Sequence, residues 1–194
     1  GVDFTGNKNI SFVAGVASYQ DLMLSGQIGN YTLNYVSALN SNIATSEVVP
    51  LEHGTASRIS IIQGPSTAIA GSIFADTLQV EILDQFSNRA IRLTQSATVV
   101  ARLLNASNQN TLATSGEYGA QAGVVTFSNL NFTSAGSRYI VFEAGSNSSV
   151  SNLVSASSNT FTITHGAPST IEWVHQPAAT VMNDVAVAGA NSAS

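Results

Sequence analysis

The segment TLQVEILD, residues 77–84, decides the fold class. Leu78, Val80 and Ile82 stand at every second position with a polar residue between them. Alternation of this kind places the apolar side chains on one face of an extended strand, whereas an amphipathic helix repeats about every 3.6 residues. The segment therefore predicts a β-strand with one buried face.

The same alternation recurs along the chain. Residues 98–103 and 160–164 repeat it, with Val99 and Phe161 on the predicted inner face, and no segment carries apolar residues at helical spacing over three turns. Clusters of Gly, Pro, Asn and Ser separate these segments, as turns require. Further strands are expected at residues 57–62, 66–70, 123–127 and 138–144. The pattern predicts an all-β chain of Ig-like Greek-key β-sandwiches.

Internal repetition divides the chain. The motif HGTASRI at residues 53–59 returns as HGAPSTI at residues 165–171, an offset of 112 (53 to 165). A second pair, GVASYQDL at 15–22 and GVVTFSNL at 123–130, has an offset of 108 (15 to 123), and the match is expected to continue from Tyr31 to Tyr139. Self-similarity at a fixed offset indicates structural repeats. The expected domains are the C-terminal part of one Ig-like repeat at residues 1–52, a complete repeat at 53–164 and the N-terminal part of a further repeat at 165–194.

The segments ASRISIIQGP at residues 56–65 and VEILDQFSN at 80–88 resemble tandem bacterial-type Ig-like repeats of large cell-surface and extracellular proteins. Such a repeat opens near Q-x-P and Ala-Gly, continues with V-x-V-x-D-x-x-G-N, and later has G-x-x-x-F-x-x-L and G-x-Y-x-L strands. Residues 123–130 and 136–141 fill the last two patterns. Ser87 departs from the pattern because it stands where the family usually has glycine. The resemblance implies Ig-like sandwiches and a place in stalks, adhesins or surface filaments.

The composition excludes several function classes. The chain has 194 residues, of which 9% are charged, and its six Lys and Arg residues are scattered singly. Nucleic-acid binding needs clustered cations, so no nucleic-acid partner is expected. No apolar run approaches the ~20 residues of a membrane span, so no membrane insertion is expected in this segment. Cysteine is absent, which removes disulfides and thiol chemistry. The neutral surface, rich in hydroxyl and amide groups, favours an extracellular or cell-surface location.

The histidines, which could take part in catalysis or metal binding, recur with the sequence repeat. His53 and His165 occupy the same repeat position, and with Gly54 and Gly166 they are interpreted as interdomain junction residues. There is no His pair at metal-ligand spacing, no carboxylate cluster and no strained G-x-S-x-G turn, so no catalytic residue, metal ligand or cofactor is expected. The segment DQFSN at 84–88 offers two side-chain oxygens to calcium but also suits a β-turn, which is favoured.

The sequence also bears on covalent crosslinks and glycosylation. Lysine is absent from residues 53–194, so the complete repeat cannot hold a Lys–Asn or Lys–Asp isopeptide bond. Five N-x-S/T sequons occur, about as many as chance gives. Asn105 and Asn147 are expected in polar loops and are the favoured N-glycosylation candidates, ahead of Asn9, Asn30 and Asn131.

Three aromatic residues are interpreted as structural. Trp173 replaces Ile61 in register, which favours a core or junction position over a sugar-binding one. Tyr31 and Tyr139 are expected at matched positions, each anchoring a corner through its hydroxyl.

The expected function is that of a non-enzymatic structural segment in an extracellular stalk or filament. Its partners would be neighbouring Ig-like repeats of the same protein and, in a filament, other copies. Two alternatives stay open: an adhesin-type binding module that recognises a glycan or protein through loops 105–111, 115–122 and 145–158, and an accessory domain of a hydrolase. Residues 1–52 lack opening strands and residues 165–194 supply only opening strands. Either residues outside this sequence or a neighbouring subunit, by strand addition, would complete them.

Overall fold

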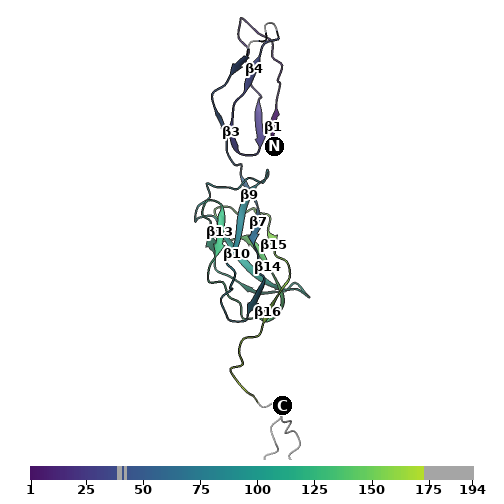
Figure 1. Cartoon of the computed structure of the whole chain (residues 1–194), viewed down its shortest axis with the longest axis vertical. Coiled ribbons are helices and arrows are strands. Elements are labelled where there is room, and N and C mark those ends of the chain that lie inside the picture. The colour runs from purple at the N-terminus through teal and green to yellow at the C-terminus, as the bar shows by residue number, and fades with distance from the viewer. Residues whose placement is uncertain (39–40, 42, 173–194) are drawn as a thin grey trace, which may run out of the picture.

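The computed structural model describes residues 1–38, 41 and 43–172. Within these residues the chain forms strands β1 to β16 and no helix, so the all-β prediction is confirmed. Figure 1 shows two parts in succession, which we call the N-terminal lobe (residues 1–52) and the two-sheet unit (residues 53–164).

The two-sheet unit consists of a smaller and a larger sheet. The smaller sheet has the order β13-β9-β7, and all of its pairings are antiparallel. Its strands are β7 (Ala56–Gln63), β9 (Leu78–Asp84) and β13 (Val124–Phe127). The larger sheet has the order β11-β10-β14-β16-β8, in which β8 runs parallel to β16. Its strands are β8 (Thr67–Ile69), β10 (Thr98–Asn105), β11 (Thr111–Thr114), β14 (Gly136–Ala144) and β16 (Phe161–Thr164), with β12 (Tyr118–Gly119) paired to β10 and β15 (Ala156–Ser157) paired to β14.

One hydrophobic core joins the two sheets. Leu78, Val80 and Ile82 of β9 are fully buried, as the alternation predicts, and they share a cluster with Ile140 and Phe142 of β14. Aromatic rings pack edge to face or tilted within this core, for example Phe127 and Phe142 with ring centroids 5.2 Å apart. The alternating pattern of β9 therefore correctly predicts which of its side chains are buried.

The structure adds short strands to regions interpreted as loops. Strands β12 and β15 lie within residues 115–122 and 145–158, and each has only two residues. A two-residue strand has no alternation to detect, because its pairing depends on backbone groups rather than on side chains. The strands expected at 57–62, 66–70, 77–84, 98–103, 123–127, 138–144 and 160–164 are confirmed as β7, β8, β9, β10, β13, β14 and β16 with small differences at their ends.

The N-terminal lobe consists of three two-stranded antiparallel sheets. The pairs are β1 (Val2–Thr5) with β2 (Met23–Gly26), β3 (Gly29–Tyr31) with β6 (Val49–Leu51), and β4 (Asn34–Val36) with β5 (Ile43–Thr45). No residue described in the lobe is classed as buried, whereas the buried residues of the described chain run from Ile59 to Ile163. The lobe therefore has paired strands but no closed core.

One hairpin turn is the same in both parts. Val13 and Val16 exchange two backbone hydrogen bonds of 2.9 and 3.0 Å, and Gln121 and Val124 do so at 2.8 and 3.0 Å. The two residues between them have positive φ in each case: 51° and 80° at Ala14-Gly15, and 47° and 76° at Ala122-Gly123. Positive φ at both central positions defines the type I′ turn that suits the twist of a hairpin.

The correspondence shifts by one residue after this turn. Tyr35 lies opposite Ala44, and Phe142 lies opposite Ala156. Tyr35 therefore corresponds to Phe142, an offset of 107 (35 to 142), and Tyr31 corresponds to Arg138. The expected match of Tyr31 with Tyr139 is wrong, because a shift of one residue moves a side chain to the other face of a strand. The Tyr31 hydroxyl donates to the Gln27 carbonyl at 2.8 Å within the lobe.

Residues 165–172 leave the two-sheet unit at the end opposite to the lobe (Figure 1). Each of them is exposed. The interpretation of Trp173 lies outside the described residues.

Candidate functional site at the interdomain junction

The lobe and the two-sheet unit meet at a short connection. Strand β6 ends at Leu51 and strand β7 begins at Ala56. The residues between them approach the turn that follows β9, and the same turn approaches the segment between β2 and β3. The junction therefore has three components: the connection, the turn and one lobe segment.

Asp84, the last residue of β9, lies at the centre of this junction. Its side chain is fully buried and accepts four hydrogen bonds. The Gly54 N–H of the connection donates to Oδ2 at 2.8 Å, and the N–H groups of Phe86 and Asn88 donate to Oδ1 at 2.9 Å each. The Asn88 side-chain amide donates to Oδ2 at 3.0 Å. A buried carboxylate is tolerated here because N–H donors take the place of water on both oxygens.

Asn88 extends this network into the lobe. Its Nδ2 donates to the Gly26 carbonyl at 2.7 Å, and its Oδ1 accepts from the Ile28 N–H at 3.1 Å. The Asn88 side chain is only 7% exposed. We call Asp84 and Asn88 the junction clamp, because together they bind both the connection and the lobe segment 26–28.

The clamp holds its charge in the folded state. Burial of Asp84 opposes ionisation, but the hydrogen bonds from the Asn88 side chain and from the backbone N–H groups of Gly54, Asn88 and Phe86 outweigh it and lower the pKa of the carboxyl. Each of those donors favours the carboxylate over the neutral acid. The clamp is therefore anionic at neutral pH.

His53 and Arg92 flank the clamp. The Arg92 backbone N–H donates to His53 Nε2 at 3.2 Å, and the Arg92 side chain forms a salt bridge with Glu52. Both side chains of that salt bridge are more than half exposed, so the ion pair contributes less than the buried clamp.

Ser87 lies in the turn that follows β9. Its φ is 69°, in the left-handed region, and its N–H donates to the Asp84 carbonyl at 3.1 Å. Glycine adopts this conformation without a steric cost, whereas serine does not. The Ser87 hydroxyl accepts a hydrogen bond from the Arg58 guanidinium at 2.6 Å.

The residues predicted for the junction, His53 and Gly54, lie between β6 and β7 and bond to Arg92 and Asp84. The β-turn interpretation of residues 84–88 is confirmed by the backbone bonds from Ser87 to Asp84 and from Asp84 to Asn88. The sequence did not indicate that this turn also binds the N-terminal lobe. His165 and Gly166 are exposed, and residues 173–194 of the expected further repeat lie outside the described residues.

A second polar network ties together three segments of the two-sheet unit. Glu117 accepts hydrogen bonds from the hydroxyls of Thr98 at 2.6 Å and Ser146 at 2.8 Å. The N–H and the side-chain amide of Asn147 also donate to it, each at 3.1 Å. Led by the Thr98 and Ser146 hydroxyls, these donors lower the pKa of Glu117 to about 2. The network orders the loop at 145–147 against the start of β10.

The glycosylation candidates lie in different surroundings. Asn147 is exposed, but its side-chain nitrogen donates to Glu117. Asn105 ends β10 and is half-buried, rather than in a loop as expected, and its Oδ1 accepts from the Ser107 N–H at 2.9 Å. Asn9, Asn30 and Asn131 are exposed.

The described residues hold neither a candidate metal centre nor a membrane-spanning helix. Residues 1–38, 41 and 43–172 contain no group of three or more His, Cys, Asp or Glu side chains placed to hold a metal ion. In the same part of the chain, no helix has the length and hydropathy for crossing a membrane.

Comparison with known proteins adds little. No protein-family model and no curated protein matches the chain. Among solved structures, a beta-glycosidase from Bacteroides vulgatus is similar, with 10% sequence identity and a TM-score of 0.38. The match covers 78% of this chain and 20% of that one, so the chain spans about a fifth of the enzyme's length. A likeness this weak supports no conclusion about function.

Proposed function

We infer that this chain is a non-enzymatic structural segment of an extracellular stalk or filament built from tandem Ig-like domains. The Ig-like part of this proposal is supported by the strand arrangement of the two-sheet unit. Strands β7 and β8 follow one another in sequence but belong to different sheets, and β8 pairs in parallel with the last strand, β16. A chain that crosses between two sheets in this way fits a Greek-key sandwich.

The observation that carries the proposal is the junction clamp. Tandem domains joined by a bare linker change their relative angle freely, because few contacts cross between them. Here a buried carboxylate and a buried amide bind the connection and the preceding lobe at the same time. Such a contact restricts the angle between successive units and lets an array keep its length.

The parallel pair of β8 and β16 also suits a load-bearing role. Thr162, Ile163 and Thr164 of β16 pair in parallel with Thr67, Ala68 and Ile69 of β8. Because the chain reaches β8 through β7, which begins at the junction, and leaves the unit from β16, tension along the array pulls these two parallel strands past one another. Their hydrogen bonds then share the load instead of opening one by one.

The test is a distance measurement across the junction. The chain has no cysteine, so Asn30→Cys in the lobe and Thr126→Cys in β13, both exposed, provide the only spin-label sites. We expect a narrow distance distribution that broadens when Asn88→Ala is added. Asn152→Ala, an exposed residue of the same unit, is the matched control and should leave it narrow. A distribution that is broad before any clamp substitution would contradict the proposal.

The location is tested separately. Antibodies raised against the two-sheet unit should label intact cells of the source organism, and external protease should remove that label. Labelling only after the cells are opened would contradict the extracellular part of the proposal while leaving the clamp measurement unaffected.

A binding module is the second candidate, and the Glu117 network favours it. Glu117 fixes the loop at 145–147 through Ser146 and Asn147, and a preordered polar loop binds with a smaller entropy cost than a flexible one. Screening the chain against glycan and protein arrays tests this candidate. Binding that Glu117→Gln and Ser146→Ala both reduce would support recognition.

A further inference from the structure

Backbone groups contact both ring nitrogens of His53. Its Nδ1 lies 2.8 Å from the Gly54 carbonyl oxygen, and the Arg92 N–H donates to its Nε2 at 3.2 Å. A backbone carbonyl can only accept a hydrogen bond, and a backbone N–H can only donate one. Nδ1 therefore carries the ring proton and Nε2 is unprotonated. The two contacts are compatible with the neutral ring in this one tautomer only.

His53 joins the connection to the segment that follows the turn. We call residues 89–93 the post-turn segment. Among the described residues the Arg92 N–H of this segment has no hydrogen-bond partner other than the half-buried His53. Gly54 of the connection is held on both sides, because its N–H donates to Asp84 and its carbonyl accepts from His53. The ring thus links the post-turn segment to the same residue that the junction clamp binds.

Protonation of the ring removes this link. Because Nδ1 already carries a proton, a second proton binds at Nε2, where it faces the Arg92 N–H. Two donors then stand where the structure has a hydrogen bond of 3.2 Å, and neither can accept from the other. The bond from Nδ1 to Gly54 is compatible with both states of the ring. Proton uptake therefore separates His53 from the post-turn segment and leaves it bound to the connection.

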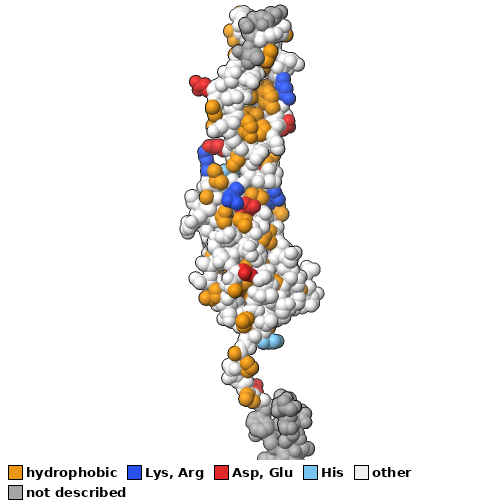
Figure 2. Space-filling view, in the orientation of Figure 1, with side chains coloured by type: hydrophobic (Ala, Val, Ile, Leu, Met, Phe, Trp, Pro, Cys, Tyr) orange, Lys and Arg blue, Asp and Glu red, His pale blue; other side chains and the backbone are white. Residues whose placement is uncertain are grey.

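The charged groups next to His53 belong to the junction itself. Glu52 precedes it in the connection and forms a salt bridge with Arg92, and Figure 2 shows acidic and basic side chains side by side at the surface near the junction. Asp84 lies on the other side of Gly54. Because hydrogen bonds lower the pKa of Asp84, the clamp keeps its charge over the range in which histidine titrates.

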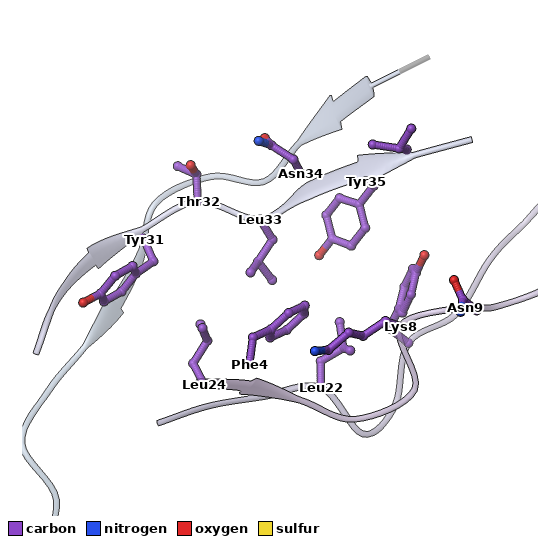
Figure 3. Close-up of a pocket in the computed structure, with 12 residues that line it drawn as sticks. Phe4, Lys8, Asn9, Leu22, Leu24, Tyr31, Thr32, Leu33, Asn34 and Tyr35 are labelled. Atoms are coloured by element: carbon purple, nitrogen blue, oxygen red, sulfur yellow. The ribbon is translucent and has the colours of Figure 1, made fainter. Parts of the chain in front are cut away.

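Other elements around the junction contribute little charge. The post-turn segment has one more cation, Arg89, which is paired with Glu81 of β9. Residues 26–28 of the lobe and strand β6 contain no charged residue. The lobe pocket shown in Figure 3 is lined by one charged side chain, Lys8, and by no residue of the junction. The groups that face a proton on His53 are therefore Glu52, Asp84 and Arg92.

We propose that His53 is a pH-sensitive link in the junction: the neutral ring holds the post-turn segment against the connection, and the protonated ring releases it and widens the range of angles between the lobe and the two-sheet unit. This inference rests on the structural role proposed above and adds a means of regulating it. Because histidine changes its charge between about pH 5 and 8, mild acid is sufficient. The junction clamp stays in place, so the two parts loosen without separating.

The repeat supplies an internal reference for this link. His165 stands at the offset of 112 (53 to 165), and each histidine precedes a glycine. His165 is exposed, and no hydrogen bond of the described residues involves it. The two histidines therefore share a local sequence and differ in their contacts.

The first test reads the tautomer of each ring. Long-range proton–nitrogen NMR spectra of the full chain at about pH 8, where histidine is neutral, distinguish a protonated Nδ1 from a protonated Nε2. Substituting each histidine in turn assigns the signals. We expect His53 to be protonated at Nδ1 alone and His165 to exchange between both tautomers. A His53 protonated at Nε2, or the same mixture at both residues, would overturn the proposal.

The second test follows the junction as the pH is lowered from about 8 to about 5. The distance distribution between spin labels at Asn30→Cys and Thr126→Cys should broaden. Exchange of the Arg92 N–H, corrected for the intrinsic effect of pH, should quicken about fivefold, the scale of one hydrogen bond. His53→Phe should remove both responses to pH, and His165→Phe, the matched control, should leave both unchanged.

The outcomes separate this inference from the structural role on which it rests. A distribution that is narrow at every pH, or a broadening that survives His53→Phe, would overturn the pH-sensitive link and leave the structural role intact. A distribution that is broad at every pH would contradict the structural role and the link with it.

Discussion

The N-terminal lobe and the two-sheet unit share a sequence pattern but differ in burial. Both contain the same type I′ turn, and both continue into a strand whose aromatic residue, Tyr35 or Phe142, lies opposite an alanine. Phe142 is nevertheless fully buried, whereas Tyr35 is only half-buried. Local sequence is thus sufficient for turns and strand pairs, but closing a core requires strands from elsewhere in the repeat.

The two glycines of the shared turn differ in how closely other residues approach them. A Cβ on Gly123 would come within 2.8 Å of the Ala90 carbonyl oxygen, whereas a Cβ on Gly15 would meet nothing within 4 Å. Ala90 belongs to the segment that follows β9, for which the described lobe has no counterpart. The same turn is therefore tightly packed in one part and open in the other.

The largest effect is expected from truncating the matched aromatic residues. Phe142→Ala should lower the free energy of unfolding of the two-sheet unit by about 3–5 kcal/mol, because it removes a fully buried ring from a packed core. Tyr35→Ala should cost the lobe about 1 kcal/mol or less, because water already reaches its ring. Urea unfolding followed by circular dichroism, with hydrogen exchange to assign the region, measures both. Equal losses would mean that the lobe has a closed core in solution.

Removing the clamp carboxylate should have the next largest effect. Asp84→Ala leaves the N–H groups of Gly54, Phe86 and Asn88 without their acceptor, and we expect a loss of about 3 kcal/mol. Hydrogen exchange should also quicken at Ile28, which bonds to Asn88. Asp84→Asn keeps one acceptor oxygen and should cost less. A loss below about 0.5 kcal/mol for Asp84→Ala would show that the junction is held elsewhere.

The sequence predicts the fold far better than it predicts the junction. Strand β9 is visible because Leu78, Val80 and Ile82 alternate, and alternation is a local property. The contact of Asn88 with Gly26 joins residues 62 positions apart, and neither residue type signals a partner. The motif of residues 84–88 therefore indicates a turn, while its second role depends on how the units meet.

The alignment of Tyr31 with Tyr139 also shows what sequence comparison misses. Tyr31 and Tyr139 align by letter, but the lobe has one additional residue between the turn and β3. Tyr31, which lies opposite Val49, is therefore the counterpart of Arg138, which lies opposite Phe161. Identity of residue type cannot detect such an insertion, whereas the alternation of buried and exposed residues can.

Acid should act on the two-sheet unit through Glu117. Its pKa is about 2 in the folded chain against an ordinary value of 4.5, so the ionised group stabilises the fold above pH 4.5 and this contribution is lost as the pH falls towards 2. Glu117→Gln should lower stability at pH 7 and flatten the decline between pH 4.5 and 2. Thermal unfolding across this range measures both changes. The matching lobe position, Asn9, does not ionise, so hydrogen exchange in the lobe should not follow Glu117.

The smallest effect is expected at the shared turn, where it gives the most direct comparison of the two parts. Ala14 and Ala122 are exposed and have positive φ, a conformation that costs alanine more than asparagine. Asn-Gly is also the preferred pair for a type I′ turn, so Ala122→Asn should stabilise the two-sheet unit by about 0.5–1 kcal/mol. Ala14→Asn relieves the same strain, but in the lobe it should slow hydrogen exchange only near the turn. Because Gly15 touches nothing across the lobe, its hairpin is not coupled to a core. If Ala14→Asn instead raised the unfolding midpoint as much as Ala122→Asn does, the lobe would unfold in solution as a cooperative domain with a closed core.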